Sequence, residues 1–112
     1  MSRWTQKLRR GGAQSYGTLP PPATTDWIAS TGASGEIILH RYNPIPPPAD
    51  YWGARYRAAA STTWLYWANQ TSDTFTIGGL TPGASYELQI GWWAATVRIS
   101  EYSASKLQSA GA

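Results

Sequence analysis

Beyond residue 23, the chain consists of short runs in which apolar and polar residues alternate, separated by turn residues. Residues 86–90, YELQI, put the three apolar residues on one face of an extended strand and Glu and Gln on the other. No stretch after residue 23 keeps a helical period. The runs that we expect to be strands are residues 25–31, 35–42, 51–57, 63–68, 73–77, 86–93 and 97–103. Seven such strands, with turn signals at regular spacing, are typical of an antiparallel β-sandwich.

In two of these runs the alternation predicts on which face of the strand the aromatic residues lie. In the run 51–57, Trp52 and Tyr56 fall on the apolar face, so we expect both in the core. In the run 63–68, Trp and Tyr at alternate positions share one face, while Leu and Trp share the other. One face of this strand must therefore expose a large aromatic side chain.

The first 22 residues differ from the rest and are predicted to form an extended N-terminal arm. Residues 1–10 place Trp4 and Leu8 four positions apart, as on one face of a short helix, but a helix of this length is not stable alone in water. The Gly- and Pro-rich stretch that follows breaks any helix and favours a spacer. We therefore expect two parts, an arm at residues 1–22 and a sandwich at residues 23–112.

The most specific motif lies before the run YELQI. Leu80, Pro82, Gly83 and Tyr86 match the pattern L-x-P-G-x-x-Y, which resembles the signature of fibronectin type III domains. In that family the motif joins the fifth strand to the sixth. The resemblance implies that Leu80 closes the core, that Pro82 and Gly83 make the turn, and that Tyr86 forms a tyrosine corner by bonding to upstream backbone.

The resemblance covers roughly residues 24–106. It implies an all-β fold, a seven-stranded antiparallel β-sandwich of the fibronectin type III or immunoglobulin-like kind. Two departures stand out. Tyr42 occupies the place where the family usually has a Trp shortly before a Pro, and the pair Trp92-Trp93 follows the sixth strand where polar residues are typical. The pair suggests that this end of the sheet is covered.

Composition points to a contact surface. Only 13% of the residues are charged, whereas there are seven Trp and seven Tyr. Tyr and Trp suit half-buried surfaces and contacts with partners. The candidate partner-binding tryptophans are Trp64, Trp67, Trp92 and Trp93. The alternative is that these rings only shield the edges of a small sandwich. We favour a contact surface, and a protein partner over a carbohydrate.

The positive charge of the chain is concentrated in the arm. Residues 1–22 hold four basic residues and no acid, whereas residues 23–112 hold five basic and six acidic residues. The candidate partner-binding residues of the arm are Arg3, Trp4, Lys7, Leu8, Arg9 and Arg10. The arm could bind nucleic acid, dock in an acidic groove of a protein, or be disordered. Four charges are few for DNA, so we favour docking on a protein.

The sequence offers no constellation for catalysis, a metal or a cofactor. The absence of Cys excludes disulfides and thiolate zinc sites. His40 is the only histidine, and no local pattern pairs it with a nucleophile and an acid. We therefore expect no enzyme activity and no cofactor. The basic N-terminus lacks a following apolar run, and no run of about eighteen apolar residues occurs, so we expect neither a secretory signal nor a membrane span.

These features together predict a structural module of a large assembly. Our first hypothesis is a virion protein of a tailed bacteriophage, such as a capsid decoration, head-fibre or tail-associated protein, made in the host cytoplasm. Its partners would be other protein subunits of the capsid or tail, with the arm as an anchor. The alternative is a carbohydrate-binding or host-adhesion module that stacks its Trp rings on a surface glycan.

Overall fold

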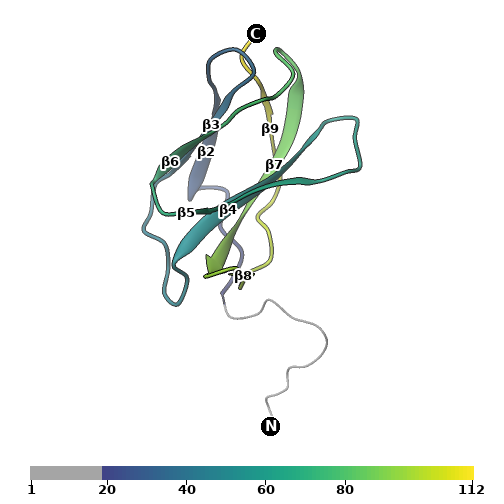
Figure 1. Ribbon diagram of the computed structural model, residues 1–112. Coiled ribbons are helices and arrows are strands. Elements are labelled where there is room, and N and C mark those ends of the chain that lie inside the picture. The colour runs from purple at the N-terminus through teal and green to yellow at the C-terminus, as the bar shows by residue number, and fades with distance from the viewer. Residues whose placement is uncertain (1–18) are drawn as a thin grey trace.

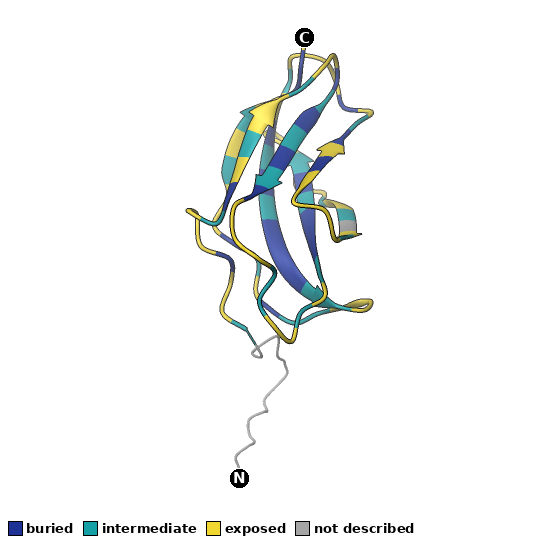
Figure 2. Ribbon diagram, turned by 90° about the vertical axis from the view of Figure 1, so that its left-hand side faces the viewer, coloured by how far each residue is buried: buried dark blue, intermediate teal, exposed yellow. Residues whose placement is uncertain are grey.

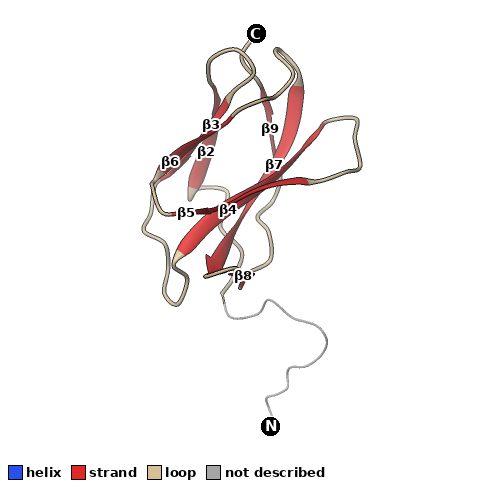
Figure 3. Cartoon of the chain, viewed as in Figure 1, coloured by secondary structure: helices blue, strands red, loops and turns tan. Residues whose placement is uncertain are grey.

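The computed structural model describes residues 19–112, which form two antiparallel sheets packed face to face, with no helix in this range (Figures 1 and 3). The strands are β2 (Trp27–Thr31), β3 (Ile37–Arg41), β4 (Tyr51–Ala58), β5 (Leu65–Gln70), β6 (Thr74–Ile77), β7 (Ser85–Ala94), β8 (Val97–Arg98) and β9 (Lys106–Ser109). The smaller sheet has the order β2-β3-β6. The larger has the order β5-β4-β7-β8, with β9 also paired to β7. The predicted all-β sandwich is confirmed.

The last strand of the sandwich is divided into two pieces along β7. The segment β8 pairs with the end of β7, where Trp93 lies opposite Arg98, and β9 pairs with its beginning, where Leu88 lies opposite Lys106. The run expected at residues 97–103 is therefore a strand only at its start, and the ladder resumes further along the chain than the sequence indicated. Counting β8 and β9 as one interrupted strand gives the expected seven.

Two buried serines explain the interruption. The backbone N–H groups of Trp92 and Ile90 on β7 donate hydrogen bonds to the hydroxyl groups of Ser100 and Ser103, both at 3.0 Å. The two hydroxyls thus take the place of carbonyl acceptors that a regular neighbouring strand would supply. Such side-chain bonds satisfy the sheet edge without a continuous ladder.

The core consists of the inward faces of both sheets. Trp52 and Tyr56 on β4 are buried as expected, and so are the apolar residues of YELQI on β7. Buried and less buried positions alternate along the strands (Figure 2). The core residues are Trp27, Ile37, Leu39, Trp52, Ala54, Tyr56, Phe75, Ile77, Leu80, Tyr86, Leu88, Ile90, Trp92 and Ala110. Both sheets contribute aromatic rings, which fill the space between them.

The motif at residues 80–86 forms the predicted corner. The phenol oxygen of Tyr86 accepts a hydrogen bond from the backbone N–H of Thr81 at 2.9 Å. Leu80 is buried. Gly83 has a φ of 77°, in the left-handed region that a residue without a side chain adopts most readily. The corner, its turn and its closing leucine are thus confirmed.

At the end of β3 the inward position holds a charged residue. Arg41 is 8% exposed, whereas Tyr42, the counterpart of the family's Trp, is 58% exposed. The Arg41 guanidinium donates to the backbone carbonyls of Asn43 and Thr71 and lies 5.5 Å from the centroid of the Trp52 ring. Burial lowers the pKa of Arg41, and the nearby carboxylate of Asp73 opposes this shift. This buried arginine was not predicted from the sequence.

One open side of the sandwich is closed by side chains. The Lys106 ammonium on β9 donates to the carbonyls of Thr24 and Trp27, at 2.8 and 2.6 Å, and lies over the Trp27 ring. The Thr31 hydroxyl donates to the carbonyl of Ser109 at 2.9 Å. These bonds connect β2, at the edge of one sheet, to β9 in the other sheet.

The arm falls largely outside the described residues, and so do its candidate binding residues, which are Arg3, Trp4, Lys7, Leu8, Arg9 and Arg10. The first described residues already contact the sandwich. The N–H of Leu19 donates to the carbonyl of Ile99 at 3.1 Å, and Pro22 is buried. The boundary at residue 22 stays a prediction, although Leu19 and Pro22 lie against the body.

Candidate functional site

The outer face of the larger sheet collects arginine and aromatic side chains. On β4, Arg55 and Arg57 are two positions apart and point away from the core, as the alternation predicts. Tyr66 on β5 lies opposite Arg55 and is 61% exposed. The set that we call the arginine–aromatic ladder consists of Arg57, Trp64, Arg55, Tyr102 and Arg98.

Guanidinium groups and rings alternate along this ladder. The Trp64 ring contacts two guanidiniums, with centroid distances of 4.3 Å to the Cζ atom of Arg57 and 4.2 Å to that of Arg55. The Tyr102 ring contacts Arg55, at 4.2 Å, and Arg98, at 4.1 Å. All four distances are well inside the range of a cation–π interaction. Each cation therefore contacts at least one ring.

A residue without a side chain makes room for the far end of the ladder. Gly91 lies on the outer face of β7, under Arg98 and Tyr102. A Cβ atom at this position would come within 3.2 Å of the Arg98 Cδ atom and 3.4 Å of the Tyr102 ring. Gly91 is paired with Gly53 on β4, so neither residue places a side chain on the outer face of the sheet at this point. The two side chains can therefore lie flat on the backbone.

Polar groups on β7 hold the two β4 arginines in place. The Arg57 Nε atom donates to the Glu87 carboxylate at 2.9 Å, and Arg55 Nε donates to the Gln89 side-chain oxygen at 2.7 Å. The Ser105 hydroxyl donates to the other Glu87 oxygen. This hydrogen bond, followed by that from Arg57, holds the pKa of Glu87 below its ordinary value. Three guanidiniums and one carboxylate leave the ladder positively charged.

The predicted tryptophans do not form one surface. Trp64 lies in the ladder, and Trp93 lies on the same outer face by alternation along β7, partly buried. Trp67 lies opposite Ala54 and packs against the core. Trp92 is 4% exposed and belongs to the core, so including it in an exposed contact surface was wrong. Strand parity decides this, because adjacent residues on β7 point to opposite faces.

The prediction from sequence missed Arg55, Arg57, Arg98, Tyr102 and Tyr66 as site residues. A signal for two of them was present, because Arg55 and Arg57 alternate with core residues and so had to point outward together. The contribution of Tyr102 had no such signal, because it comes from the irregular segment between β8 and β9. Its place beside Arg55 depends on the two serines that anchor that segment.

A hollow lies where the chain enters the sandwich. It has a volume of about 250 Å³ and is mostly apolar. Its lining residues are Leu19, Pro20, Pro21, Asp26, Asn43, Pro44, Pro46 and Trp92. The Asp26 carboxylate accepts hydrogen bonds from the Asn43 amide at 2.7 Å and from the N–H of Ala23 at 2.9 Å. The hollow thus has one acidic group, already held by its neighbours.

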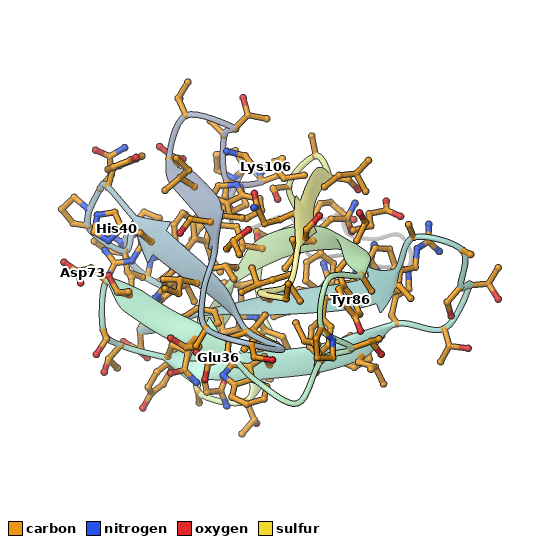
Figure 4. The ribbon with its side chains drawn as sticks, turned by 90° about the horizontal axis from the view of Figure 1, so that it is seen from above. Glu36, His40, Asp73, Tyr86 and Lys106 are labelled. Atoms are coloured by element: carbon orange, nitrogen blue, oxygen red, sulfur yellow. The ribbon has the colours of Figure 1, made fainter. Side chains whose placement is uncertain are left out.

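No catalytic constellation forms around the only histidine. The His40 Nδ1 atom is 2.7 Å from the hydroxyl oxygen of Thr74, which in turn lies 3.3 Å from an Asp73 carboxylate oxygen. Figure 4 shows His40 and Asp73 on one side of the molecule. Asp73 contacts Thr74 and not His40, so this carboxylate does not orient the histidine as a general base requires.

Neither a metal site nor a membrane span is found in the part of the chain that the structure describes. Within residues 19–112, no group of three or more His, Cys, Asp or Glu side chains is placed to hold a metal ion. The same range has no helix long and apolar enough to cross a bilayer.

The chain has no match among the models of known protein families. No curated protein matches it in sequence either. Comparisons with solved structures, in contrast, give clear matches to domains of one kind.

The crystal structure of chicken CNTN1 FN1–FN3 domains superposes with a TM-score of 0.70 at 14% identity, over 83% of this chain and 33% of that one. The FN5 domain of Drosophila Lar gives 0.63 at 16% identity, over 82% and 98% of the two chains. The fn3 domain of human contactin 1 gives 0.67 at 16% identity, over 78% and 75%. At these identities the likeness concerns the fold alone, and the fold of this chain is that of a fibronectin type III domain.

Proposed function

We propose that the chain is a non-enzymatic module that joins protein subunits of a larger assembly, and that the outer face with the arginine–aromatic ladder is its contact surface. The observation that carries this proposal is the ladder, with Tyr66 exposed beside it. Arg, Tyr and Trp are the residues most enriched at the energetic centres of protein interfaces. Arginines already fixed by rings lose little side-chain freedom on binding.

The more specific proposal is a bacteriophage virion protein, attached to the capsid or tail by its N-terminal arm. Its support is compositional: a basic arm without acids is joined to a sandwich that is poor in charge and rich in aromatic residues. Such a module would add copies according to the symmetry of the particle. The virion would then be its location, and capsid or tail subunits its partners.

The alternative of a glycan-binding module has less support from the geometry. A sugar stacks on an open ring face, but the Trp64 ring is already contacted by two guanidinium groups. Trp67 and Trp92 are turned toward the core. Titration with cell-wall or surface polysaccharides should leave the Trp fluorescence unchanged. A saturable change would favour the glycan alternative.

The proposal can be tested by sedimentation of the full chain from the cells that produce it. We expect the tagged chain in a fraction much larger than a monomer, and we expect Arg57→Ala to release it. Ser30→Thr, an exposed change on the smaller sheet, should stay in the large fraction. Sedimentation of the unaltered chain as a monomer would overturn the proposal. A large fraction without capsid or tail subunits would refute only the virion assignment.

A further inference from the structure

We propose that the ladder binds an extended acidic segment of the partner, with carboxylates at alternate positions against Arg55 and Arg57. This inference rests on the proposed function, because it names the chemistry of the partner. The two arginines lie on neighbouring outward positions of β4. Both are half-buried, with 27% of the Arg57 side chain exposed, so their ends remain within reach of a partner.

The contacts of the two guanidiniums show which of their N–H donors a partner could still bind. The faces of Arg55 contact Trp64 and Tyr102, and a face of Arg57 contacts Trp64. Their Nε atoms donate to Gln89 and Glu87. None of residues 19–112 accepts a hydrogen bond from the terminal Nη groups of Arg55 or Arg57. The paired Nη groups are the end of the fork that binds a carboxylate with two parallel hydrogen bonds.

The spacing of the two forks matches an extended segment. Side chains two positions apart on a strand are about 6.6–6.8 Å apart along it. Acidic residues at alternate positions of an extended segment repeat at the same distance, so two carboxylates can meet two forks at once. Both guanidiniums contact the Trp64 ring, which helps to hold the two forks in place.

Charge also favours an acidic partner. Arg55 and Arg57 are like charges that contact the same ring, and Glu87 forms a salt bridge with Arg57 but not with Arg55. A second carboxylate near Arg55 would therefore reduce their repulsion. The arm of this chain cannot supply it, because residues 1–22 contain no acid. The exposed ring of Tyr66, opposite Arg55, offers apolar surface to the residues between the carboxylates.

An acidic peptide fits this surface better than a nucleic acid does. A phosphate backbone needs a continuous basic track, since its affinity comes from many phosphate contacts. Beside the ladder, residues 58–72 contain no charged residue at all, and this stretch includes all of β5. Two forks, with an uncharged strand on one side, are suited to a short segment with two carboxylates.

The test is fluorescence anisotropy with the full chain and a labelled synthetic peptide carrying two Glu at alternate positions of a Ser/Thr background. A peptide of the same composition with adjacent Glu is the spacing control. We expect the alternating peptide to bind more tightly, and more salt to weaken it. Arg55→Gln and Arg57→Gln should each reduce the affinity about tenfold, as expected for a lost charge-assisted bond.

Two further variants distinguish binding that needs the forked guanidinium group from binding that needs only positive charge. Arg55→Lys keeps the charge but has no fork, so its affinity should fall as well. Ser30→Glu changes the net charge by the same amount as Arg57→Gln, but on an exposed position of the smaller sheet. It should retain most of the affinity. Circular dichroism must first confirm that each variant is folded at the temperature of the titration.

The inference is overturned if the alternating peptide fails to bind at about 1 mM, the weak end of specific affinity. Equal binding of both peptides, or equal losses for Arg57→Gln and Ser30→Glu, would overturn it too. Tighter binding of a single-stranded oligonucleotide with the same dependence on Arg55 would replace the acidic peptide by a nucleic acid. The two proposals can fail separately. If Arg57→Ala leaves the large fraction on sedimentation but the unaltered chain binds neither peptide, the proposed function stands and only this inference is refuted.

Discussion

The phenol oxygen of Tyr86 accepts a hydrogen bond from the backbone N–H of Thr81, at 2.9 Å, and so ties the start of β7 to the turn that leads into it. The donor is a backbone group in a turn, where no strand partner satisfies it. The Tyr86 ring is buried and lies edge-on to Tyr56, with centroids 6.4 Å apart. The bond therefore joins a local turn to the core.

Removing the Tyr86 hydroxyl should destabilise the domain without changing its surface. We expect Tyr86→Phe to lower the free energy of unfolding by about 1 kcal/mol or slightly more, because the Thr81 N–H loses its acceptor. Urea denaturation followed by Trp fluorescence would measure this. Tyr56→Phe is the matched control, because no described residue forms a hydrogen bond with that hydroxyl. Equal losses for the two variants would mean that the corner bond contributes nothing.

The ring of Trp64 should contribute to stability through its two cations. Trp64→Ala removes the ring that both Arg55 and Arg57 contact. We expect a loss of about 1–2 kcal/mol, from about 0.5–1 kcal/mol per cation–π contact at an exposed site. Tyr66→Ala, on the same face but 61% exposed, should change the stability by about 0.5 kcal/mol at most. Thermal or urea unfolding of the two variants would show whether the difference exists.

The carboxylate of Glu87 should make stability depend on pH in the acid range. Its hydrogen bonds from Ser105 and Arg57 hold its pKa in the folded state below the ordinary value of 4.5. The stabilisation is therefore fully present above about pH 5 and is lost as the pH falls through the folded-state pKa. Glu87→Gln should be less stable than the unaltered chain at pH 7, and this difference should shrink toward pH 3.

Urea unfolding at several pH values would measure the effect of Glu87→Gln. Glu101→Gln, which removes an exposed carboxylate without a salt bridge to any described residue, is the control. The difference measured for Glu87→Gln is compared with that for Glu101→Gln at each pH value. A difference for Glu87→Gln that grows on acidification would contradict the prediction.

A close backbone contact should make Gly111 intolerant of substitution. A Cβ atom at Gly111 would lie 2.0 Å from the carbonyl oxygen of Ala33, and backbone cannot yield as a flexible side chain can. The substitution would also strain the hydrogen bond from Gly35 N–H to the Gly111 carbonyl, at 2.8 Å. We expect Gly111→Ala to cost about 2 kcal/mol or more.

The comparison for Gly111→Ala is Gly78→Ala. A Cβ atom at Gly78 meets nothing within 4 Å, so we expect a change of at most about 0.5 kcal/mol. Denaturation curves of the two variants would decide. If Gly111→Ala were as stable as Gly78→Ala, the C-terminal segment would not be held against Ala33 in solution.

Much of the sandwich was predictable because it depends on residues that are close together in the sequence. Alternation placed Trp52 and Tyr56 in the core, and the turn motif placed Tyr86 at its corner. Both follow from the geometry of a single strand or turn and need no knowledge of the partner strand. The prediction was wrong where two strands had to be compared, as in the interrupted edge formed by β8 and β9.

By itself, the sequence determined the all-β class, the inward faces of most strands and the outward direction of Arg55 and Arg57. Only the tertiary structure decided that Arg41 occupies a core position, and that Trp64 and Tyr102 both come to lie against Arg55. The physical reason is how far apart along the chain the interacting residues lie. The period of a strand is set by its own backbone, whereas a ladder of cations and rings depends on which strands become neighbours.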